Sequence, residues 1–255
     1  MDPVLKVRDV CLSYHTLSGE TPAISHISFD LMPGEFLSIV GPSGCGKSTL
    51  LNLIAGLIEP ECGSITLKGK TVSSGSTSVG YMLQKDHLLE WRSIYKNILL
   101  GLEIRGELTP EKLAHAEELL HTYGLDRFRD ARPSQLSGGM RQRAALIRTL
   151  VLEPELLLLD EPFSALDYQT RLNVSDDIGK ILKSSGNPAI LVTHDISEAI
   201  SMADKVLVLS ARPATVQKVV DIHLSVEKRT PLTSRNAPDF KKYFNLIWKE
   251  LNKNA

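Results

Sequence analysis

The sequence predicts an α/β fold with a mostly parallel sheet, an N-terminal antiparallel β subdomain and an inserted helical subdomain. Two short, uninterrupted apolar runs, Leu156–Leu159 and Ala189–Val192, are typical of parallel strands that are covered on both faces. A third short strand, Phe36–Val40, leads into a glycine-rich loop and then into a helix. Helical periodicity dominates the residues between about Gln84 and Leu152. Alternation of strands with helices indicates parallel pairing in the main sheet.

The 255 residues can form one sizeable core but hardly two independent ones. We therefore expect a single domain of several parts. Their expected ranges are about 1–83 for the β subdomain and glycine-rich loop, 84–152 for the helical subdomain, 153–210 for the rest of the core, and 211–255 for a C-terminal strand and helix.

Composition excludes several classes of protein. The 29 basic and 30 acidic side chains give a net charge of −1, so no strong basic field indicates a nucleic-acid partner. The amino end lacks the plan of a signal peptide, and the longest aliphatic run, Leu156–Leu159, is far shorter than the ~20 residues that cross a bilayer. Cys11, Cys45 and Cys62 are odd in number and lack metal-ligand spacing, which favours a reduced, cytosolic compartment over a disulfide scaffold.

Strands and turns alternate over the first 83 residues. Val4–Tyr14 and Ile24–Leu31 are rich in β-branched and apolar residues, and the turn residues Ser18–Pro22 lie between them. We therefore expect a hairpin-like pair. The other elements expected here are strands at Ser64–Lys68 and Val79–Leu83, with a loop at Thr71–Ser78 between them.

Thr109-Pro110-Glu111 is a helix start signal, with an N-cap, a proline at the first helical position and an acid in the first turn. Ile94–Ile104 also has helical spacing. Beyond the helical subdomain we expect helices at Tyr168–Ser184 and Ile196–Ala203, strands at Val206–Leu209 and Thr215–Asp221, and a last helix over Phe240–Leu251 that packs on the core or on a partner.

The stretch Gly41-Pro42-Ser43-Gly44-Cys45-Gly46-Lys47-Ser48-Thr49 matches the phosphate-binding loop template, and its strand and helix flanks are those that the template requires. Glycines let backbone N–H groups surround a polyphosphate, and the helix N-terminus adds its positive dipole end. Lys47 is expected to reach the β- and γ-phosphates, and the Ser48 hydroxyl to hold Mg²⁺. The alternative, a glycine-rich turn with a surface lysine, explains neither flank. The sequence predicts binding of a nucleoside triphosphate.

Polar residues follow several of the expected strands. Asp160 and Glu161 end the Leu156–Leu159 run, at the sheet edge where ligands of open α/β sheets gather. Asp160 suits a metal-holding acid, and Glu161 can polarise the attacking water. His194 ends the next strand, where a contact with the γ-phosphate is favoured over a purely structural role. Gln84 either ligates Mg²⁺ or is an ordinary loop residue, and its position alone leaves both open.

Leu136-Ser137-Gly138-Gly139 precedes a good helix at Met140–Leu152. The exposed N-terminus of this helix is a second anion site. A nucleotide on the phosphate loop already has one helix start on its phosphates, so this second start is a candidate site for a nucleotide held by another copy of the chain. A glycine turn with a serine cap explains the spacing equally well.

Together these motifs closely resemble the nucleotide-binding subunit of ATP-binding cassette (ABC) transporters, over roughly Leu5 to Leu209. The resemblance implies a phosphate-loop ATPase core that uses ATP and Mg²⁺. It also implies two chains paired head to tail, with each ATP held between one phosphate loop and the partner's Ser137-Gly138-Gly139. The further roles it implies are adenine stacking for Tyr14, Mg²⁺ sensing for Gln84, catalytic base for Glu161, γ-phosphate contact for His194, and a place near the dimer seam for Asp167.

Several stretches resemble the importer branch for nitrate, sulfonate, taurine and related small solutes. They are Cys45, Gln84-Lys85-Asp86 with Leu89 and Trp91-Arg92, Met140–Arg143, Asp160–Thr170 and Arg212-Pro213. Met140 departs from the glutamine that is common at its position in the family. This resemblance implies a place at the cytoplasmic face of the membrane, a permease contacted by Gln84–Trp91, and indirectly a solute-binding protein. It does not identify the solute, which this subunit does not touch.

Two other classes share the phosphate loop. Non-transport ABC ATPases of DNA repair or translation carry long coiled coils or two cassettes, and neither is visible in this sequence. A nucleotide kinase has no use for Leu136–Gly139 or for Ser164–Asp167. An ATP-hydrolysing transporter subunit is therefore the expected function.

Overall fold

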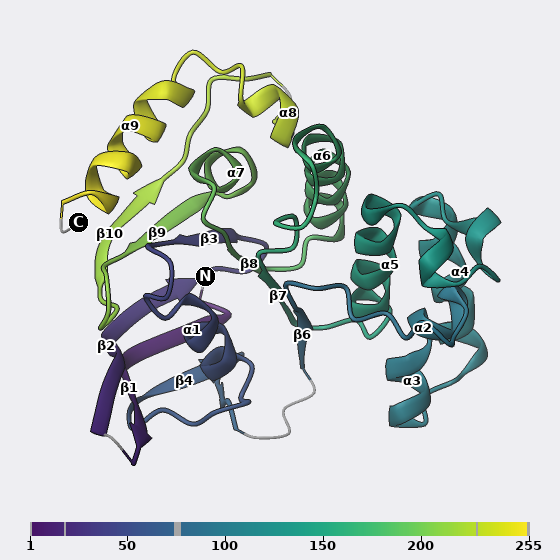
Figure 1. Cartoon of the computed structure of the whole chain (residues 1–255), viewed down its shortest axis with the longest axis horizontal. Helices are drawn as coiled ribbons and strands as arrows, with labels where there is room; N and C mark the ends of the chain where they lie inside the picture. The colour runs from purple at the N-terminus through teal and green to yellow at the C-terminus, as the bar shows by residue number, and fades with distance from the viewer. Residues whose placement is uncertain (1, 18, 74–77, 228, 254–255) are drawn as a thin grey trace.

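The computed structural model describes residues 2–17, 19–73, 78–227 and 229–253, which form two sheets and the helices around them (Figure 1). Sheet A is antiparallel, with the order β2-β1-β4-β5. Its strands are β1 (Leu5–Thr16), β2 (Gly19–Leu31), β4 (Cys62–Leu67) and β5 (Lys70–Thr71). The predicted N-terminal antiparallel part of the fold is confirmed.

One predicted turn differs from the structure. Gly19–Pro22 were expected in a turn, but they form the start of β2 because Pro22 and Thr21 pair with Ser13 and Tyr14 of β1. Ser18, the other residue of that turn, lies outside the described residues, as do residues 74–77 of the expected Thr71–Ser78 loop.

Sheet B carries the glycine-rich loop and has the order β10-β9-β3-β8-β7-β6. Its strands pair in parallel except for β10, which is antiparallel to β9. The strands are β3 (Phe36–Val40), β6 (Val79–Met82), β7 (Leu156–Asp160), β8 (Ala189–Val192), β9 (Lys205–Leu209) and β10 (Val216–Asp221). The mostly parallel sheet is thus confirmed.

Both faces of sheet B are buried, which explains why β8 and the Leu156–Leu159 part of β7 are apolar at every position. Leu156 and Leu158 pack in a core shared with sheet A and the first helix, α1 (Lys47–Ile54). Leu157 and Leu159 point the other way, into a core shared with the inserted helices. Alternation of side chains along a strand therefore makes one strand serve two cores.

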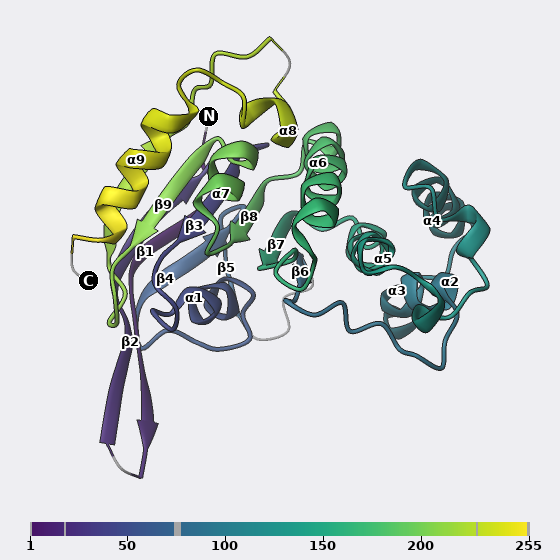
Figure 2. The same cartoon turned by 45° about the horizontal axis from the view of Figure 1, so that its top comes forward.

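Helices α6 (Tyr168–Ser185), α7 (Ile196–Met202) and α9 (Phe240–Leu251) lie on the face of sheet B opposite sheet A (Figures 1 and 2). The stretch between β6 and β7 is helical and projects beyond the β6 edge. Its helices are α2 (Ile94–Ile98), α3 (Leu100–Arg105), α4 (Pro110–Thr122) and α5 (Gly138–Leu150), with short 3₁₀ turns at Asp126–Phe128 and Pro133–Gln135; α8 (Pro231–Ser234) precedes α9. We call α2–α5 the helical lobe.

Most predicted helices agree within a residue or two. The predicted helix at Ile94–Ile104 is two helices, α2 and α3, which meet at Leu99. Helix α5 begins at Gly138, two residues before the predicted start. No helix in the described ranges is both long enough and apolar enough to span a membrane.

The helical lobe meets the sheet through a glycine. A Cβ atom on Gly80 of β6 would lie 2.7 Å from Cγ2 of Thr149, in the last turn of α5, and 2.8 Å from Cγ of Pro154. Such distances are too short for a carbon contact, so only glycine allows this approach. Helix α5 therefore packs directly on the backbone of β6.

Cys11 and Cys62 face each other across β1 and β4 and are joined by a disulfide. The sequence favoured a reduced compartment over a disulfide scaffold and did not predict this pair, because antiparallel pairing brings together two residues that are 51 positions apart. Cys45 is a free, buried thiol in the glycine-rich loop.

Candidate nucleotide-binding and hydrolysis site

The glycine-rich loop joins β3 to the N-terminus of α1. Gly44 and Gly46 have φ angles of 72° and 125°, which glycine adopts without strain. A Cβ on Gly46 would also lie 3.0 Å from the carbonyl oxygen of Ala23. The loop thus presents its backbone amides and the helix start at one place, as a phosphate site requires.

Lys47 lies in the first turn of α1, and its side chain is almost fully buried. Its Nζ donates to the carbonyl oxygens of Gly41 and Pro42, each at 2.9 Å. These bonds fold the ammonium group back over the loop that precedes it. The positive charge of Lys47 therefore lies beside the backbone of the loop, where it complements a bound anion.

Asp160 ends β7 and accepts a hydrogen bond from Ser48 of α1. Burial raises the pKa of Asp160, and the charge of Glu161 raises it further, while the hydrogen bond from Ser48 and the charge of Lys47 oppose the rise. A hard divalent cation prefers oxygen ligands of this kind. The hydroxyl of Ser48 and the carboxylate of Asp160, together with the nearby amide of Gln84, fit Mg²⁺.

Glu161, His194 and Gln84 converge at the same sheet edge. Oε2 of Glu161 lies 3.1 Å from Nδ1 of His194, and Nε2 of Gln84 donates to the same oxygen at 3.3 Å. Gln84 also donates to Oγ of Ser164 at 3.4 Å. Glu161 has a φ of 44°, which is uncommon for a residue with a Cβ. With this backbone conformation, the carboxylate of Glu161 contacts His194 and Gln84, the two strand-end residues predicted from sequence.

Tyr14 reaches the site from sheet A. Its hydroxyl is 3.1 Å from Oγ1 of Thr49 in α1, and its ring is partly exposed. An exposed aromatic ring beside the phosphate loop is suited to stacking on a base. The structure thus brings Tyr14 to the loop despite a separation of 35 residues.

Ser137, Gly138 and Gly139 lie elsewhere, at the start of α5. Oγ of Ser137 accepts a hydrogen bond from the backbone N–H of Met140 at 3.4 Å, as an N-cap does. Cβ atoms on the two glycines would lie 2.9 Å from Leu166 and 2.7 Å from Val174. Among the described residues, no hydrogen bond or ion pair joins this segment to the phosphate loop. The predicted second anion site is therefore not joined to the phosphate loop by any such contact in the described part of the chain.

Asp167 caps the N-terminus of α6 close to that segment. Its Oδ1 accepts from the backbone N–H of Thr170 at 3.0 Å, and hydrogen bonds from Thr170 lower the pKa of Asp167. A Cβ on Gly139 would lie 3.3 Å from Thr170. The two predicted seam elements, Asp167 and Ser137–Gly139, are thus neighbours.

The stretch after Gln84 is fastened to α5, a link that sequence reasoning missed. Nε of Arg141 lies 2.9 Å from Oδ2 of Asp86, and Arg148 donates to the backbone oxygens of Asp86 and His87. Burial alone would raise the pKa of Asp86, but the hydrogen bonds from Arg141 and from the backbone N–H of Leu88, with the charges of Arg141 and Arg148, together outweigh it, and the pKa is lowered. The arginines at helical spacing in α5 were a possible signal, but nothing local identified their acid.

A buried acid under His194 was also missed. Glu198 of α7 is 4% exposed and accepts a hydrogen bond from Thr193, the residue before His194. Burial raises the pKa of Glu198 to about 7. Asp195 caps the same helix through the backbone N–H groups of Ser197 and Glu198. Hydrogen bonds that involve both neighbours of His194, Thr193 and Asp195, therefore fix this segment to α7.

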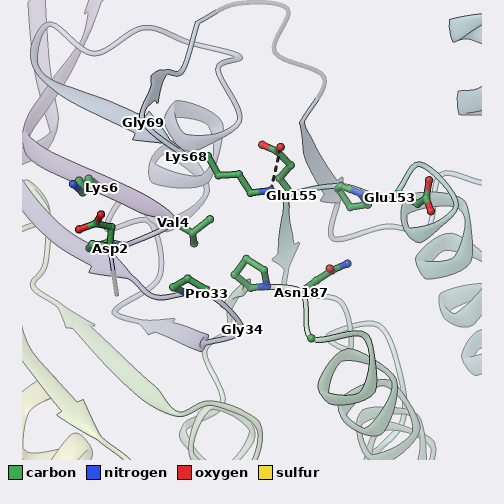
Figure 3. Close-up of a pocket in the computed structure, with 14 residues that line it drawn as sticks. Asp2, Val4, Lys6, Pro33, Gly34, Lys68, Gly69, Glu153, Glu155 and Asn187 are labelled. Atoms are coloured by element: carbon green, nitrogen blue, oxygen red, sulfur yellow. Dashed lines mark hydrogen bonds and ion pairs between the residues drawn. The ribbon is translucent and has the colours of Figure 1, made fainter.

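A cavity lies at the opposite edge of sheet B, where β3, β7 and β8 begin (Figure 3). It has a volume of about 770 Å³ and is lined by both signs of charge, and the ion pair of Lys68 with Glu155 stands inside it at 3.2 Å. Ligands of open parallel sheets bind at the carboxyl ends of the strands. The site around Asp160, Glu161 and His194 lies at the carboxyl ends of β7 and β8, away from this cavity.

A phosphate loop, a strand-end acid bonded to its serine and a polar group around Glu161 define the class: a nucleotide-binding ATPase of the phosphate-loop type. The family described as ABC transporter matches residues 24–164, more than half of the chain. The chain belongs to the ABC transporter family, and it is an ATP-binding subunit that hydrolyses ATP.

Relatives and solved structures agree with this assignment. The chain is 47% identical over 248 residues to the uncharacterized ABC transporter ATP-binding protein YtlC of Bacillus subtilis (strain 168), covering 97% of this chain and 95% of that one. It is 41% identical over 220 residues to the taurine import ATP-binding protein TauB of Rhizobium johnstonii (86% and 84% covered). It is 37% identical over 230 residues to the aliphatic sulfonates import ATP-binding protein SsuB of Bacillus subtilis (90% and 87% covered).

Among solved structures, a dimeric ATP-binding cassette in a post-hydrolysis state, bound to ADP and Pi, superposes with a TM-score of 0.73 at 28% identity. That match covers 86% of this chain and 99% of the other. The protein cbiO1 from Clostridium perfringens, part of the ABC transporter complex cbiONQ, superposes with a TM-score of 0.75 at 26% identity, covering 87% and 89%.

Proposed function

We propose that this ATPase powers the import of a small solute, of the sulfonate, taurine or nitrate kind, from the cytoplasmic face of the membrane. The 41% identity to a taurine import protein over most of the chain carries this proposal. A membrane permease forms the path, and a solute-binding protein delivers the solute to it. The chain itself contributes the energy of ATP hydrolysis.

In the proposed reaction each strand-end group has one task. Lys47 and the loop amides hold the β- and γ-phosphates. Ser48, Asp160 and Gln84 hold Mg²⁺, which neutralises charge on the phosphate oxygens. Glu161 accepts a proton from the attacking water, and His194, held through its Nδ1 to Glu161, meets the γ-phosphate.

Two copies of the chain complete the site. Ser137–Gly139 offers a helix start for phosphate but lies away from the phosphate loop of its own chain. In a head-to-tail pair it covers the nucleotide of the partner instead. A residue that completes a phosphoryl-transfer site in trans is worth ~10³–10⁵ in rate, or about 4–7 kcal/mol. A single copy is then a poor ATPase.

The Gln84–Trp91 segment is the proposed permease contact. Leu83, the residue before this segment, and Trp91, its last residue, are exposed, with Trp91 71% accessible. An exposed tryptophan is a common anchor of protein interfaces. Because Arg141 and Arg148 fasten the middle of this segment to α5, the proposed permease contact and α5 move as one body.

A growth experiment tests the proposed solute. A strain that lacks this gene should fail to grow on a sulfonate or taurine as sole sulfur source, or on nitrate as sole nitrogen source, and the wild-type gene should restore growth. The Lys47→Ala gene should not restore it. Undiminished growth of the deletion strain on all three would refute the solute class but leave ATP hydrolysis intact.

A second experiment tests the pairing. ATP turnover per chain should fall as the wild-type protein is diluted, and light scattering should show a dimer of the Glu161→Gln variant with ATP and Mg²⁺. Turnover that is independent of dilution, in a protein that stays monomeric, would exclude the shared site.

A further inference from the structure

A cluster of metal-binding side chains lies on sheet A, outside the nucleotide site. Cys11 of β1, Cys62 of β4 and His26 of β2 place their ligand atoms within 4.8 Å of one another. Sγ of Cys11 is 3.6 Å from Nδ1 of His26. Oδ1 of Asp9 is 2.7 Å from the same nitrogen. Three strands thus meet at four side chains with metal-ligating atoms.

The backbone is irregular where these side chains meet. Asp9 and His26 have φ angles of 52° and 51°, in the left-handed region, and β1 shifts register against both of its neighbours between Arg8 and Leu12. Such a conformation costs about 1–3 kcal/mol at a residue with a Cβ, although aspartate and histidine tolerate it better than most. The strain at two facing residues turns Asp9 and His26 toward the cysteines.

We propose that Cys11, Cys62 and His26, with Asp9 in the fourth position, form a site for a thiolate-preferring divalent cation of the Zn²⁺ class once the disulfide is reduced. Two cysteines, a histidine and a carboxylate are a ligand set that Zn²⁺ favours. Tetrahedral Zn²⁺ with ordinary bond lengths sets sulfur and nitrogen ligands about 3.6 Å apart. Cys11 and His26 have this separation already.

The chemistry needs only a thiol reductant and the metal ion. Two molecules of a small cellular thiol give two electrons and two protons to the Cys11–Cys62 disulfide and leave as their own disulfide. Zn²⁺ then displaces the two thiol protons. Neutral His26 binds the metal through Nδ1 and keeps its proton on Nε2. The Asp9 carboxylate gives up its contact with Nδ1 of His26 and binds the metal instead.

The inference is independent of ATP chemistry, because none of the four residues belongs to the nucleotide site. The sequence spacing did not predict the cluster, since its members are distributed over more than fifty positions and only the pairing of β1 with β2 and β4 collects them.

Cobalt binding to the full chain tests the proposal. The wild-type protein, reduced with a phosphine under nitrogen and freed of reductant, is titrated with Co²⁺ and then with Zn²⁺. We expect a sulfur-to-cobalt charge-transfer band and the intense visible bands of a tetrahedral site, both removed by Zn²⁺. His26→Ala should weaken metal binding by at least ~10–100-fold. This is the loss seen when a residue that only hydrogen-bonds to a metal ligand is removed, and His26 would be a ligand itself.

His15→Ala is the matched control. His15 of β1, like His26 of β2, is an exposed histidine that pairs with a carboxylate, in this case Glu61 at 2.8 Å. It should bind cobalt like the wild type. Cys62→Ser should abolish the charge-transfer band. Oxidising the wild type should also abolish it, and reduction should restore it, which keeps the test decisive if Cys62→Ser does not fold. No band in the reduced wild type, or a band that survives oxidation or His26→Ala unchanged, would overturn the proposal.

Discussion

Substitution of Glu161 by glutamine isolates the proposed proton acceptor. Glutamine keeps the size of the side chain and its bonds to His194 and Gln84, which now hold the carboxylate at 3.1 and 3.3 Å. Only the basic oxygen is lost. The side chain of Glu161 is 21% exposed and no core contact changes, so we expect the free energy of unfolding to change by less than about 1 kcal/mol.

The rate should change far more than the stability. A positioned general base contributes ~10²–10⁴ in rate, which is about 3–5 kcal/mol at 1.36 kcal/mol per decade. Steady-state phosphate release at saturating ATP and Mg²⁺ measures this loss, and equilibrium nucleotide titration should show affinity within a few-fold of the wild type. Slow hydrolysis should also trap the ATP-bound dimer.

Glu155→Gln is the control for this experiment. The two glutamates flank the same strand: Glu155 precedes β7 at the far edge of the sheet, where it pairs with Lys68, and Glu161 follows it. The same chemical change at Glu155 should leave turnover at the wild-type level. If Glu161→Gln hydrolyses ATP as fast as Glu155→Gln, Glu161 is not the base.

Two further changes test the phosphate loop and the support of the His194 segment. Lys47→Ala should weaken ATP binding at least about tenfold, because a hydrogen bond to a charged group is worth roughly 1.5–3 kcal/mol, and unchanged affinity in a fluorescent-nucleotide titration would exclude this loop as the site. Glu198→Gln should stabilise the protein above pH 7 by up to about 3 kcal/mol, and this gain should vanish toward pH 4.5. The reason is that burial raises the pKa of Glu198 from 4.5 to about 7, so the wild type loses stability as the pH rises from about 4.5 to about 7. Urea unfolding at a series of pH values measures the gain, and a difference that is constant with pH would contradict the buried-acid explanation.

Local chemistry predicted much of the site from sequence. The phosphate loop is one continuous segment whose glycines and flanks define it, and the apolar strands place Asp160, Glu161 and His194 at one edge because parallel strands end together. The start of α4 at Thr109 followed from its cap and proline in the same way. In each case neighbouring residues contain the whole signal.

Features that depend on pairing between distant segments could not be predicted. The hairpin extends through Gly19–Pro22 because β1 continues beside it, although those residues favour a turn. The contact of Arg141 with Asp86 depends on packing within the helical lobe, and that of Cys11 with Cys62 on strand pairing in sheet A. The roles of Tyr14, Ser137–Gly139 and Asp167 in the working dimer stay predictions.

The absence of a side chain at Gly80 has a mechanical consequence. Because Gly80 has no side chain, only the short side chain of Thr149 and the ring of Pro154 lie against the backbone of β6 at this contact. A tilt of β6 would therefore move α5 directly, and the other end of α5 carries Ser137–Gly139, the segment proposed to meet the neighbouring copy. One methyl group added at Gly80 would push α5 away from β6 and so change the position of Ser137–Gly139 in the proposed pair.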